Sequence, residues 1–343
     1  MQVSIVGATG YTGIELVRLI KNHPRAEIAL LTSENFAGER IADIYPHLSD
    51  IIDSRCQQVD ADDIAECSDM VFTALPHGVS SKLVPDLLEK GLQVIDLSGD
   101  YRYQNPDIYR EWYQKHENPD LMARATYGLA EIREEQIKNS RLIANPGCYP
   151  TSSLIPLYPF LAEGIINSET EIIIDAKSGV TGAGRKPSRK KHFCEVQENF
   201  QAYSVEGHRH RSEIAEKLKN WTEYSAEITF TPHLLPLKRG ILTTIYSSCG
   251  QQYEQKSLVS LYEDYYSENR FIRIFTEKKP QLKYVTGTNF CDISVTRLSS
   301  GRLKIISALD NLIKGAAGQA VQNMNLLCSW PTELGLDDIG LYL

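Results

Sequence analysis

"IVGATGYTGIEL", residues 5–16, places three glycines between a β-branched run and an amphipathic segment. Gly7 permits a tight turn, Gly10 lets the backbone approach a pyrophosphate, and Gly13 allows a helix to pack closely on a strand. The helix that begins here would offer free N–H groups and a partial positive charge to a phosphate. The stretch predicts a dinucleotide-binding strand–turn–helix, with a purely structural turn as the alternative. We assign to the cofactor the residues of this turn: Gly7, Thr9, Gly10, Tyr11, Thr12 and Gly13.

Short apolar runs alternate with helix-length segments up to residue 146. Strands separated by such helices are typical of a parallel sheet covered on both faces. We therefore expect an α/β domain of the Rossmann type. The expected strands are 2–6, 26–33, 69–75, 92–98 and 141–145, and the expected helices are 11–23 and 79–91.

After residue 146 the strands have fewer helices between them, which predicts an α+β domain with a mixed or antiparallel sheet. Segment 152–164 looks helical but contains Pro156 and Pro159, so we expect an interruption there. We predict a nucleotide-binding domain of residues 1–146 with 310–343, and a catalytic and oligomerisation domain of residues 147–309. The expected strands of the second domain are 170–179, 226–233, 240–249, 290–298 and 302–309, and the last expected helix is 310–328.

The bulk composition limits the partners. A formal net charge of −8 over 343 residues disfavours nucleic acid and anionic membranes, because both require a large cationic surface. The basic run 185–193 is one short stretch of an acidic protein. The sequence shows neither a signal-like start nor 18 consecutive apolar residues, so we expect no membrane span. Seven scattered cysteines without a C-x-x-C pair indicate reduced thiols in the cytoplasm and no zinc ribbon.

The end of the second expected strand, "LLTSENFAGER" (30–40), bears on which dinucleotide binds. Ser33 and Arg40 suit the 2′-phosphate of NADP, whereas Glu34 suits the ribose hydroxyls of NAD. We predict NADP(H). Pro76 and His77 end another strand, where loops of such a domain meet the cofactor, and we assign both to the cofactor site.

"NPGCYPT" (145–151) places Cys148 between an expected strand and an expected helix. Pro150 suits the first turn of a helix, where its missing N–H has no cost. The positive end of that helix favours the thiolate, and nearby peptide N–H groups are placed to hold an oxyanion. We predict a nucleophile; the alternative is a small buried thiol.

"SVEGHRHRSEIAEKL" (204–218) supplies proton-transfer candidates for that thiolate. His208 and His210 point to the same side if this stretch is extended. A helix that begins near His210 places Glu213 about one turn later, where it can orient the imidazole. Two solvated histidines at a helix start are the alternative.

Together these segments resemble the N-acetyl-γ-glutamyl-phosphate reductases, acyl-phosphate reductases of arginine biosynthesis that are related to the aspartate-semialdehyde dehydrogenases. The cysteine and His-Arg-His segments are the specific ones. The matching segments, in order, are "GATGYTG" (7–13), "ALPHGVS" (74–80), "DLSGDYR" (96–102), "YGLAE" (127–131), "NPGCYPT" (145–151), "KSGVTGAGRKP" (177–187), "HRHRSEI" (208–214), "PHLLPLKRGIL" (232–242) and "DNLIKGAAGQAVQNMN" (310–325).

The resemblance implies a mechanism without a metal. The thiolate attacks the acyl phosphate, phosphate leaves, and the resulting thioester is reduced by NADPH to the aldehyde. It implies Cys148 as nucleophile and His210 with Glu213 as acid/base, with His208 as second choice. It also implies cofactor contacts from the loop at 178–184 and the start of the last helix, and we assign Ser178, Gly179, Gly182 and Asn311 to the nicotinamide side.

The implied substrate is a small acyl phosphate with a carboxylate, which requires converging polar and basic groups. Homo-oligomers are usual for such enzymes, so we expect a homodimer or homotetramer. The alternatives are the aspartyl or amino-adipyl phosphate reaction, or a non-catalytic NADP-binding sensor. We assign to the substrate Arg102, Asn145, Arg185 and Arg209.

Overall fold

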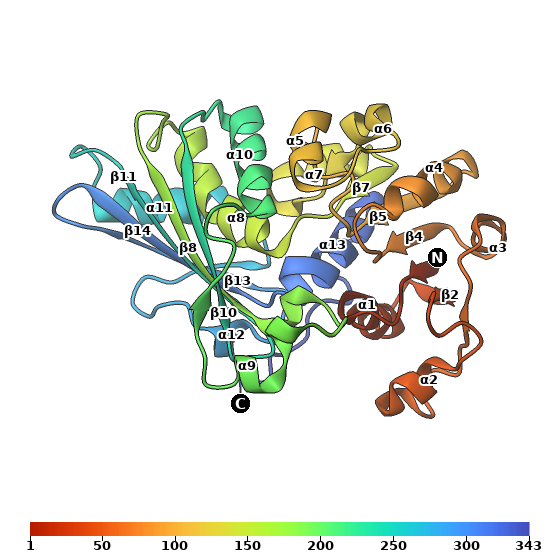
Figure 1. Cartoon of the computed structure of the whole chain (residues 1–343). Helices are drawn as coiled ribbons and strands as arrows, with labels where there is room; N and C mark the ends of the chain where they lie inside the picture. The colour runs from red at the N-terminus through yellow and green to blue at the C-terminus, as the bar shows by residue number, and fades with distance from the viewer. Residues whose placement is uncertain (343) are drawn as a thin grey trace. The chain divides into compact units, whose positions relative to one another are not determined.

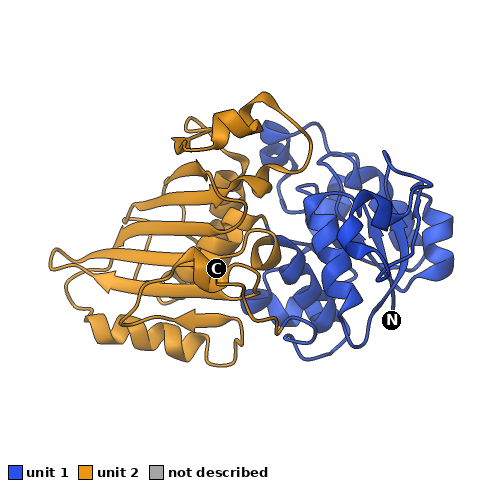
Figure 2. Cartoon of the chain, turned by 90° about the horizontal axis from the view of Figure 1, so that it is seen from below, with its two compact units in different colours: residues 1–146, 316–336 blue, residues 147–315, 337–343 orange. Residues whose placement is uncertain are grey.

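A computed structural model describes residues 1–342, which form two compact units (Figures 1 and 2). The first unit contains Met1–Pro146 and Ala316–Leu336. The second contains Gly147–Gly315 and residues 337–342. The chain therefore enters the second unit one residue before Cys148. Residue 343, the last of the predicted nucleotide-binding domain, lies outside the described residues.

Within residues 1–342, the first unit is built on a sheet of seven strands in the order β3-β2-β1-β4-β5-β7-β6. All neighbouring strands run parallel, as predicted. The chain order reverses between β1 and β4, so the turns that follow these two strands meet at one edge of the sheet, where ligands of such folds bind. The strands are β1 (Gln2–Val6), β2 (Glu27–Thr32), β3 (Cys56–Gln57), β4 (Met70–Thr73), β5 (Gln93–Asp96), β6 (Thr126–Tyr127) and β7 (Leu142–Ala144).

Helices connect these strands, and the central strands are buried along nearly their whole length. Such strands read as continuous apolar runs because parallel sheets of this kind are covered on both faces. The helices are α1 (Tyr11–Lys21), α2 (Ile41–Ile44), α3 (Ala61–Cys67), α4 (Ser80–Glu89), α5 (Pro106–Trp112), α6 (Pro119–Arg124), α7 (Ala130–Lys138) and α13 (Gly318–Leu327), with a 3₁₀ turn at Pro46–Leu48.

The second unit is built on a mixed sheet in the order β12-β13-β14-β11-β8-β10-β9, which confirms the predicted class (Figure 1). β8–β10 and β12–β13 are parallel, and the other neighbours are antiparallel. The strands are β8 (Ile172–Gly179), β9 (Gln201–Ala202), β10 (Ile228–Leu235), β11 (Ile241–Ser248), β12 (Ile272–Ile274), β13 (Cys291–Arg297) and β14 (Arg302–Leu309).

Helix α8 packs on this sheet, and α10 packs on α8. The helices of the second unit are α8 (Cys148–Ala162), α9 (Phe193–Val196), α10 (Arg209–Thr222), α11 (Gln255–Tyr265) and α12 (Leu282–Val285), with 3₁₀ turns at Val180–Ala183 and Arg189–Lys191.

The predicted interruption of α8 is wrong. The helix runs through Pro156 and Pro159 without a break, and almost all of its side chains are buried. Each proline removes one N–H group from the helix, and this leaves the carbonyl one turn earlier without its usual donor. Those two carbonyls must therefore find partners elsewhere.

Side-chain hydroxyls supply the missing donors. Ser307, on β14, donates its Oγ hydrogen to the carbonyl oxygen of Ser152 at 2.6 Å. Tyr266, which follows α11, donates its hydroxyl hydrogen to the carbonyl oxygen of Ile155 at 2.5 Å. The helix is continuous because the surrounding unit satisfies the groups that the two prolines leave open.

The expected return of residues 310–343 to the first domain also needs correction, because only 316–336 join that unit. Asp310 is fully buried in the second unit. Its carboxylate accepts the N–H groups of Leu312 and Ile313 at the start of the last helical segment, and that of Gly287 at 2.9 Å. The segment then begins with a π-helical turn, Ile313–Ala317, instead of the regular helix expected over 310–328.

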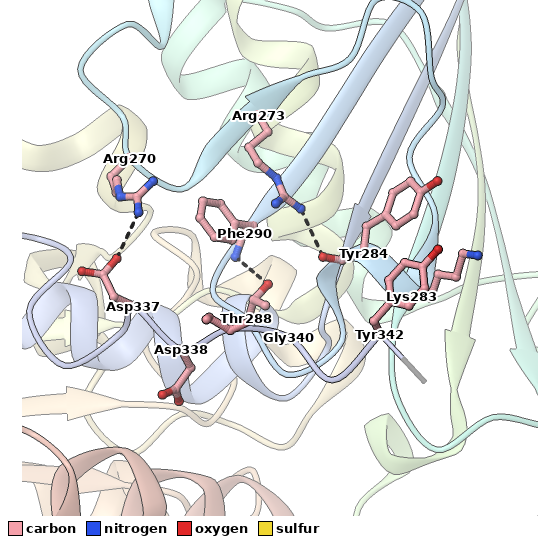
Figure 3. Close-up of a pocket in the computed structure, with 11 residues that line it drawn as sticks. Arg270, Arg273, Lys283, Tyr284, Thr288, Phe290, Asp337, Asp338, Gly340 and Tyr342 are labelled. Atoms are coloured by element: carbon pink, nitrogen blue, oxygen red, sulfur yellow. Dashed lines mark hydrogen bonds and ion pairs between the residues drawn. The ribbon is translucent and has the colours of Figure 1, made fainter.

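Residues 337–342 belong to the second unit for a different reason (Figure 3). Asp337 lies 3.4 Å from Arg270 in an ion pair between their side chains. Tyr342 stacks on Tyr284, with ring centroids 6.2 Å apart and planes 12° from parallel. These contacts hold the final segment against strand β12 and helix α12.

We predict that Tyr266→Phe lowers the free energy of unfolding by about 1–3 kcal/mol, because it leaves a buried carbonyl without its donor while keeping the ring. Urea unfolding measures the change. The matched control is Tyr246→Phe on β11, where the tyrosine is 41% exposed and the effect should stay within about 0.5 kcal/mol. Equal effects in the two variants would refute the role assigned to the Tyr266 hydroxyl.

Candidate active site

The turn after β1 requires glycine at two positions, because a side chain there would clash with the backbone. Gly7 has φ +85°, and a Cβ there would lie 2.5 Å from the carbonyl oxygen of Ala74. A Cβ on Gly13 would lie 2.2 Å from the carbonyl oxygen of Gly7. Gly10 is the N-cap of α1 and provides no side-chain cap, so the first-turn N–H groups of this 11-residue helix are left for a ligand. The turn thus fits a pyrophosphate.

The predicted residues near the adenosine side lie on two segments of the first unit. The hydroxyls of Thr9 and Ser33 are 2.8 Å apart, so the turn and the end of β2 are joined. Arg40 forms an ion pair with Asp53 at 2.9 Å, and its side chain is 40% exposed. Both side chains are exposed to solvent, which screens the charges and weakens this ion pair.

The loop after β4 is fixed by a residue that our sequence reasoning did not single out. Asp100 is fully buried, and its carboxylate accepts the N–H of Gly78 at 2.7 Å and that of Ser81 at 3.0 Å. His77 accepts the N–H of Gly99 on Nδ1 at 2.7 Å, whereas Pro76 is exposed. This carboxylate therefore positions the predicted cofactor loop. The only sign of this role in the sequence was the second aspartate of the segment "DLSGDYR" (96–102).

Arg102 and Asn145, the two predicted substrate residues of the first unit, are held in place by contacts with the protein. The Arg102 guanidinium donates to the carbonyl oxygens of Asn145 and Leu97, both at 2.8 Å, and the residue is 6% exposed. The Asn145 amide donates to the carbonyl oxygen of Ala316 and accepts from Asn323. Together they fix the end of β7, shortly before the chain reaches the start of α8 at Cys148.

Cys148 is the first residue of α8, as predicted, and the residue before it is anchored. The N–H of Gly147 donates to Oε1 of Glu213 at 3.0 Å, and Glu213 is fully buried on α10. The carbonyl of Gly147 accepts the N–H and the hydroxyl of Thr151. Glu213 was expected to orient a histidine; the contact seen here anchors the start of the cysteine helix.

The two histidines have different surroundings. His208 is the N-cap of α10, and its Nδ1 accepts the N–H of His210 at 3.1 Å. Burial, with the nearby charge of Arg209, lowers the pKa of His208 to about 4. His208 is therefore neutral at physiological pH, with its hydrogen on Nε2. His210 is 6% exposed and lies within the first turn of the helix.

An aromatic cluster joins the cysteine segment to the histidines. The ring of Tyr149 lies 5.8 Å from that of His208 and 5.7 Å from that of His210, centroid to centroid. Tyr203 donates its hydroxyl hydrogen to the Tyr149 hydroxyl at 3.1 Å. Burial raises the pKa of Tyr203 to about 12, and the adjacent charge of Cys148 adds to the effect. Both tyrosines, which our sequence reasoning missed, lie beside the predicted nucleophile in the same unit.

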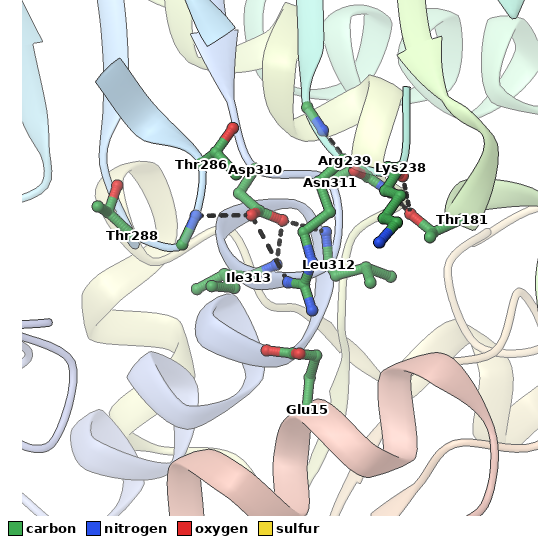
Figure 4. Close-up of polar contacts among 12 residues, drawn as sticks. Glu15, Thr181, Lys238, Arg239, Thr286, Thr288, Asp310, Asn311, Leu312 and Ile313 are labelled. Atoms are coloured by element: carbon green, nitrogen blue, oxygen red, sulfur yellow. Dashed lines mark hydrogen bonds and ion pairs between the residues drawn. The ribbon is translucent and has the colours of Figure 1, made fainter. Parts of the chain in front are cut away.

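The predicted nicotinamide-side residues of the second unit lie on neighbouring loops, and Figure 4 shows the contacts of one of them, Asn311. A Cβ on Gly179 would lie 2.7 Å from the carbonyl oxygen of Lys238, and one on Gly182 would lie 3.3 Å from Oγ of Ser178. Asn311 accepts the N–H of Gly240 at 2.7 Å and donates to the hydroxyl of Thr181 at 3.0 Å. A single amide thus ties the loop after β8 to the loop before β11.

The remaining predicted residues differ in exposure. Arg209 is half-buried, and its charge acts on both His208 and Tyr203. Arg185 is exposed in the loop that follows the 3₁₀ turn at Val180–Ala183. The geometry therefore places one of the two arginines next to the cluster.

A hollow of about 360 Å³ lies elsewhere in the second unit, among β12, α12 and the final segment (Figure 3). Its lining holds Arg270, Arg273 and Lys283, together with Asp337 and Asp338. Acids of the same unit pair with its arginines, and the hollow contains none of the predicted site residues. We assign no function to it.

Residues 1–342 hold neither a cluster of metal-ligating side chains nor a helix that could span a membrane. No group of three or more His, Cys, Asp or Glu side chains in that range is placed to hold a metal ion. No helix in the same range is long and apolar enough to cross a bilayer.

Comparison with known families matches almost the whole chain. Residues 2–140 match the family described as "Semialdehyde dehydrogenase, NAD binding domain", and residues 148–311 match "Semialdehyde dehydrogenase, dimerisation domain". The chain is 50% identical to the N-acetyl-gamma-glutamyl-phosphate reductase of Halothermothrix orenii, covering 100% of this chain and 99% of the relative. It is 44% identical to the protein of that name from Methanocaldococcus jannaschii, covering 99% of each.

Solved structures show the same fold at lower identity. Aspartate semialdehyde dehydrogenase II of Vibrio cholerae aligns with a TM-score of 0.72 at 18% identity, over 96% of this chain and 98% of that one. A Candida albicans aspartate semialdehyde dehydrogenase with NADP aligns with a TM-score of 0.71 at 18% identity, over 95% and 98%. The family match and this fold together show that the first unit is a domain for a nicotinamide dinucleotide.

We predict that His208 makes unfolding pH-dependent. Its pKa is about 4 in the folded protein, against 6.5 as the model-peptide value, so the unfolded chain binds a proton first as pH falls. The stabilisation is complete above about pH 6.5 and is lost towards about pH 4, by up to about 3 kcal/mol. Urea unfolding across this range measures it.

The comparison variant is His208→Asn, which keeps an acceptor for the helix cap but does not titrate. Since burial also lowers the pKa of His23 and His116, the difference between wild type and variant carries the test. The exposed His47 provides the control His47→Asn, which should keep the wild-type slope. A slope in His208→Asn as steep as in wild type would contradict the assignment.

Proposed function

The chain belongs to the N-acetyl-γ-glutamyl-phosphate reductases of the semialdehyde dehydrogenase family, and from this we propose that it reduces N-acetyl-γ-glutamyl phosphate to N-acetylglutamate semialdehyde, with NADPH as reductant and phosphate as the second product, in arginine biosynthesis. The observation that carries the proposal is the position of Cys148: the first residue of a 15-residue helix, behind an anchored glycine, in a chain similar to these reductases over its full length.

Cys148 is the proposed nucleophile. Its sulfur attacks the carbonyl carbon of the acyl phosphate, the carbon–oxygen bond to phosphate breaks, and a thioester remains on the enzyme. The first turn of α8 supports this step because its N–H groups and its dipole stabilise the thiolate and the oxyanion that develops beside it. Neither needs to move during the reaction, since the hydrogen bond from Gly147 to Glu213 fixes the start of the helix.

A nicotinamide dinucleotide, when bound, supplies the hydride that reduces this thioester. We propose that the glycine turn and the N-terminus of α1 hold its pyrophosphate, with Pro76 and His77 in the adjoining loop. Ser33 and the solvent-accessible Arg40 hold a 2′-phosphate, which makes NADPH the preferred form. On the second unit, Ser178, Gly179, Gly182 and Asn311 provide a loop whose backbone can approach the nicotinamide closely.

His210 is the proposed acid/base, in line with its position beside Tyr149. As an imidazolium it protonates the oxyanion that forms when hydride reduces the thioester, and it takes this proton back as the carbon–sulfur bond breaks to release the aldehyde and the Cys148 thiolate. His208 is neutral and acts as the helix cap whose Nδ1 accepts the His210 N–H. This division of roles follows from the low pKa of His208, because a neutral imidazole is a far weaker proton donor than an imidazolium.

Anionic groups of the substrate require cations near the sulfur. We propose that Arg209, whose charge already acts on the aromatic cluster, contacts the carboxylate or the phosphate, and that Arg185 contributes from its exposed loop. Arg102 and Asn145 contribute by holding the end of β7 ahead of the nucleophile.

We also propose that the protein is a cytoplasmic homodimer or homotetramer. The match of residues 148–311 to a dimerisation domain supports an assembly, and seven cysteines outside any disulfide support a reducing compartment. Light scattering on a sizing column tests the first statement: a monomer mass at micromolar protein would overturn it.

We predict turnover of N-acetyl-γ-glutamyl phosphate with NADPH at a kcat/KM at least about 10-fold above that with NADH, and above that with aspartyl or amino-adipyl phosphate. Arg40→Ala should reduce the NADPH preference.

Cys148→Ser should keep the fold and cofactor affinity but lose more than about 10³-fold in kcat, because the hydroxyl is a far weaker nucleophile. Coupled absorbance of NADPH and mass spectrometry of the quenched thioester provide the readouts.

Three outcomes separate the competing hypotheses. Preference for aspartyl or amino-adipyl phosphate would reassign the substrate. NADPH binding without turnover, and with slow alkylation of Cys148, would indicate a sensor. Retained turnover in Cys148→Ser would remove the covalent step.

We predict that His210→Asn reduces kcat by about 10²–10⁴-fold, as loss of a general acid does. His208→Asn should cost less, because the asparagine oxygen still caps α10 and the lost imidazole is not an imidazolium at pH 7. Steady-state kcat over pH 5 to about 9 separates the two, since only His210→Asn should also remove the limb due to the acid. The reverse order of losses would exchange the roles.

A further inference from the structure

Gly315 lies directly against the nucleophile within the second unit. A Cβ on Gly315 would be 2.9 Å from Cβ and 3.3 Å from Cα of Cys148. Real Cβ atoms essentially never approach other atoms within 3.0 Å, so any other residue requires one of the two segments to shift. Only glycine fits this position without a shift, because there is no room for a side chain between the turn and Cys148.

The turn that carries Gly315 is not a regular α-helix. The N–H of Gly315 donates to the carbonyl oxygen of Asp310 at 2.9 Å, which is the π-helical pattern. Insertions of this type are uncommon and are found frequently at functional sites. The wider turn brings the Cα of Gly315 to the sulfur-bearing residue.

Neither side of this contact is free to yield. On one side, Cys148 begins a buried helix whose preceding residue is held by Glu213. On the other, the Asp310 carboxylate fixes the start of the turn, as Figure 4 shows, and Leu309 lies 3.3 Å from the position of the added Cβ. Leu309 is fully buried. Strain introduced at position 315 must therefore reach the Cys148 side chain.

We propose that Gly315 is a positioning residue for the reaction: its missing side chain lets the π-helical turn seat against Cβ of Cys148 and thereby sets the direction of the sulfur. The inference rests on the proposed function only in that Cys148 is the nucleophile. A misplacement of the reacting atom by about 1 Å can cost about 10²-fold in rate, so a shift of a few tenths of an ångström is measurable.

The test variant is Gly315→Ala, measured in two ways on the full-length protein. The first is kcat with the acyl phosphate and NADPH, where we expect a loss of at least about 10-fold with the KM for NADPH within about 2-fold. The second is the rate of iodoacetamide alkylation of Cys148 without substrate, which should change at least about 3-fold because the sulfur points differently.

Two further variants separate positioning from loss of stability. Gly301→Ala, in the hairpin between β13 and β14, forces alanine into φ +79° and destabilises the same unit away from the sulfur. It should keep wild-type kcat and alkylation. Leu309→Val with Gly315→Ala gives the turn room to move away from Cys148, so it should recover part of the lost kcat relative to Gly315→Ala.

Each result decides the inference. Wild-type kcat and alkylation in folded Gly315→Ala would overturn it, as would an equal loss of kcat in Gly301→Ala. If Gly315→Ala does not fold, the double variant is compared with Leu309→Val under the same criteria. A wild-type protein that fails to turn over the acyl phosphate, while alkylation still responds to Gly315→Ala, would refute the proposed function and leave the positioning role standing.

Discussion

The hydrogen bond from the Gly147 N–H to the Glu213 carboxylate is the constraint on which the active-site arrangement depends. It satisfies a peptide donor at the start of α8 with a fully buried carboxyl group. It also joins two helices that carry different chemical groups, the cysteine on α8 and the histidines at the start of α10. The contact between these two helices therefore involves neither the sulfur nor an imidazole.

The remaining features of this region act in the same direction. His208 caps α10 and stays neutral, Asn311 ties two loops together, and Asp310 fixes the turn that reaches Cys148. Each uses a buried or half-buried polar side chain that accepts at least one backbone N–H. Such groups are costly when unsatisfied, so the arrangement resists alternatives once it has formed. Rigid support of this kind is what a reaction through a precisely aimed thiolate requires.

Much of the fold could be predicted, because it depends on local patterns. Short apolar runs separated by helix-length segments identified the parallel sheet, and strands with fewer helices between them after residue 146 identified the mixed sheet. Two-residue strands such as β3 and β6 gave no pattern to detect. The continuity of α8 was missed because Ser307 and Tyr266 are more than 100 positions away from the carbonyls they satisfy.

The candidate site divides in the same way. Recognisable sequence segments contain Cys148, the two histidines and the glycine loops. The structure places Cys148, His208 and His210 around the Tyr149 side chain in the second unit. The anchoring of Gly147 by Glu213 could not be predicted from the spacing of Glu213 to His210, because that contact is with a backbone N–H in another segment. Asp100, Tyr149 and Tyr203 were missed for the same reason: their function lies in tertiary contacts. The burial of Arg102, which we assigned to the substrate, also depends on tertiary contacts.

The prolines of α8 have a consequence for how this sequence can change during evolution. Each hydroxyl that serves one of them is useful only while that proline is present, since a residue with its own N–H would compete for the same carbonyl. Pro159 and Tyr266, and likewise Pro156 and Ser307, should therefore be gained or lost as pairs over evolutionary time. A lineage that replaced one member would favour a compensating change in the other. This is epistasis between two residues that are linked through one backbone carbonyl.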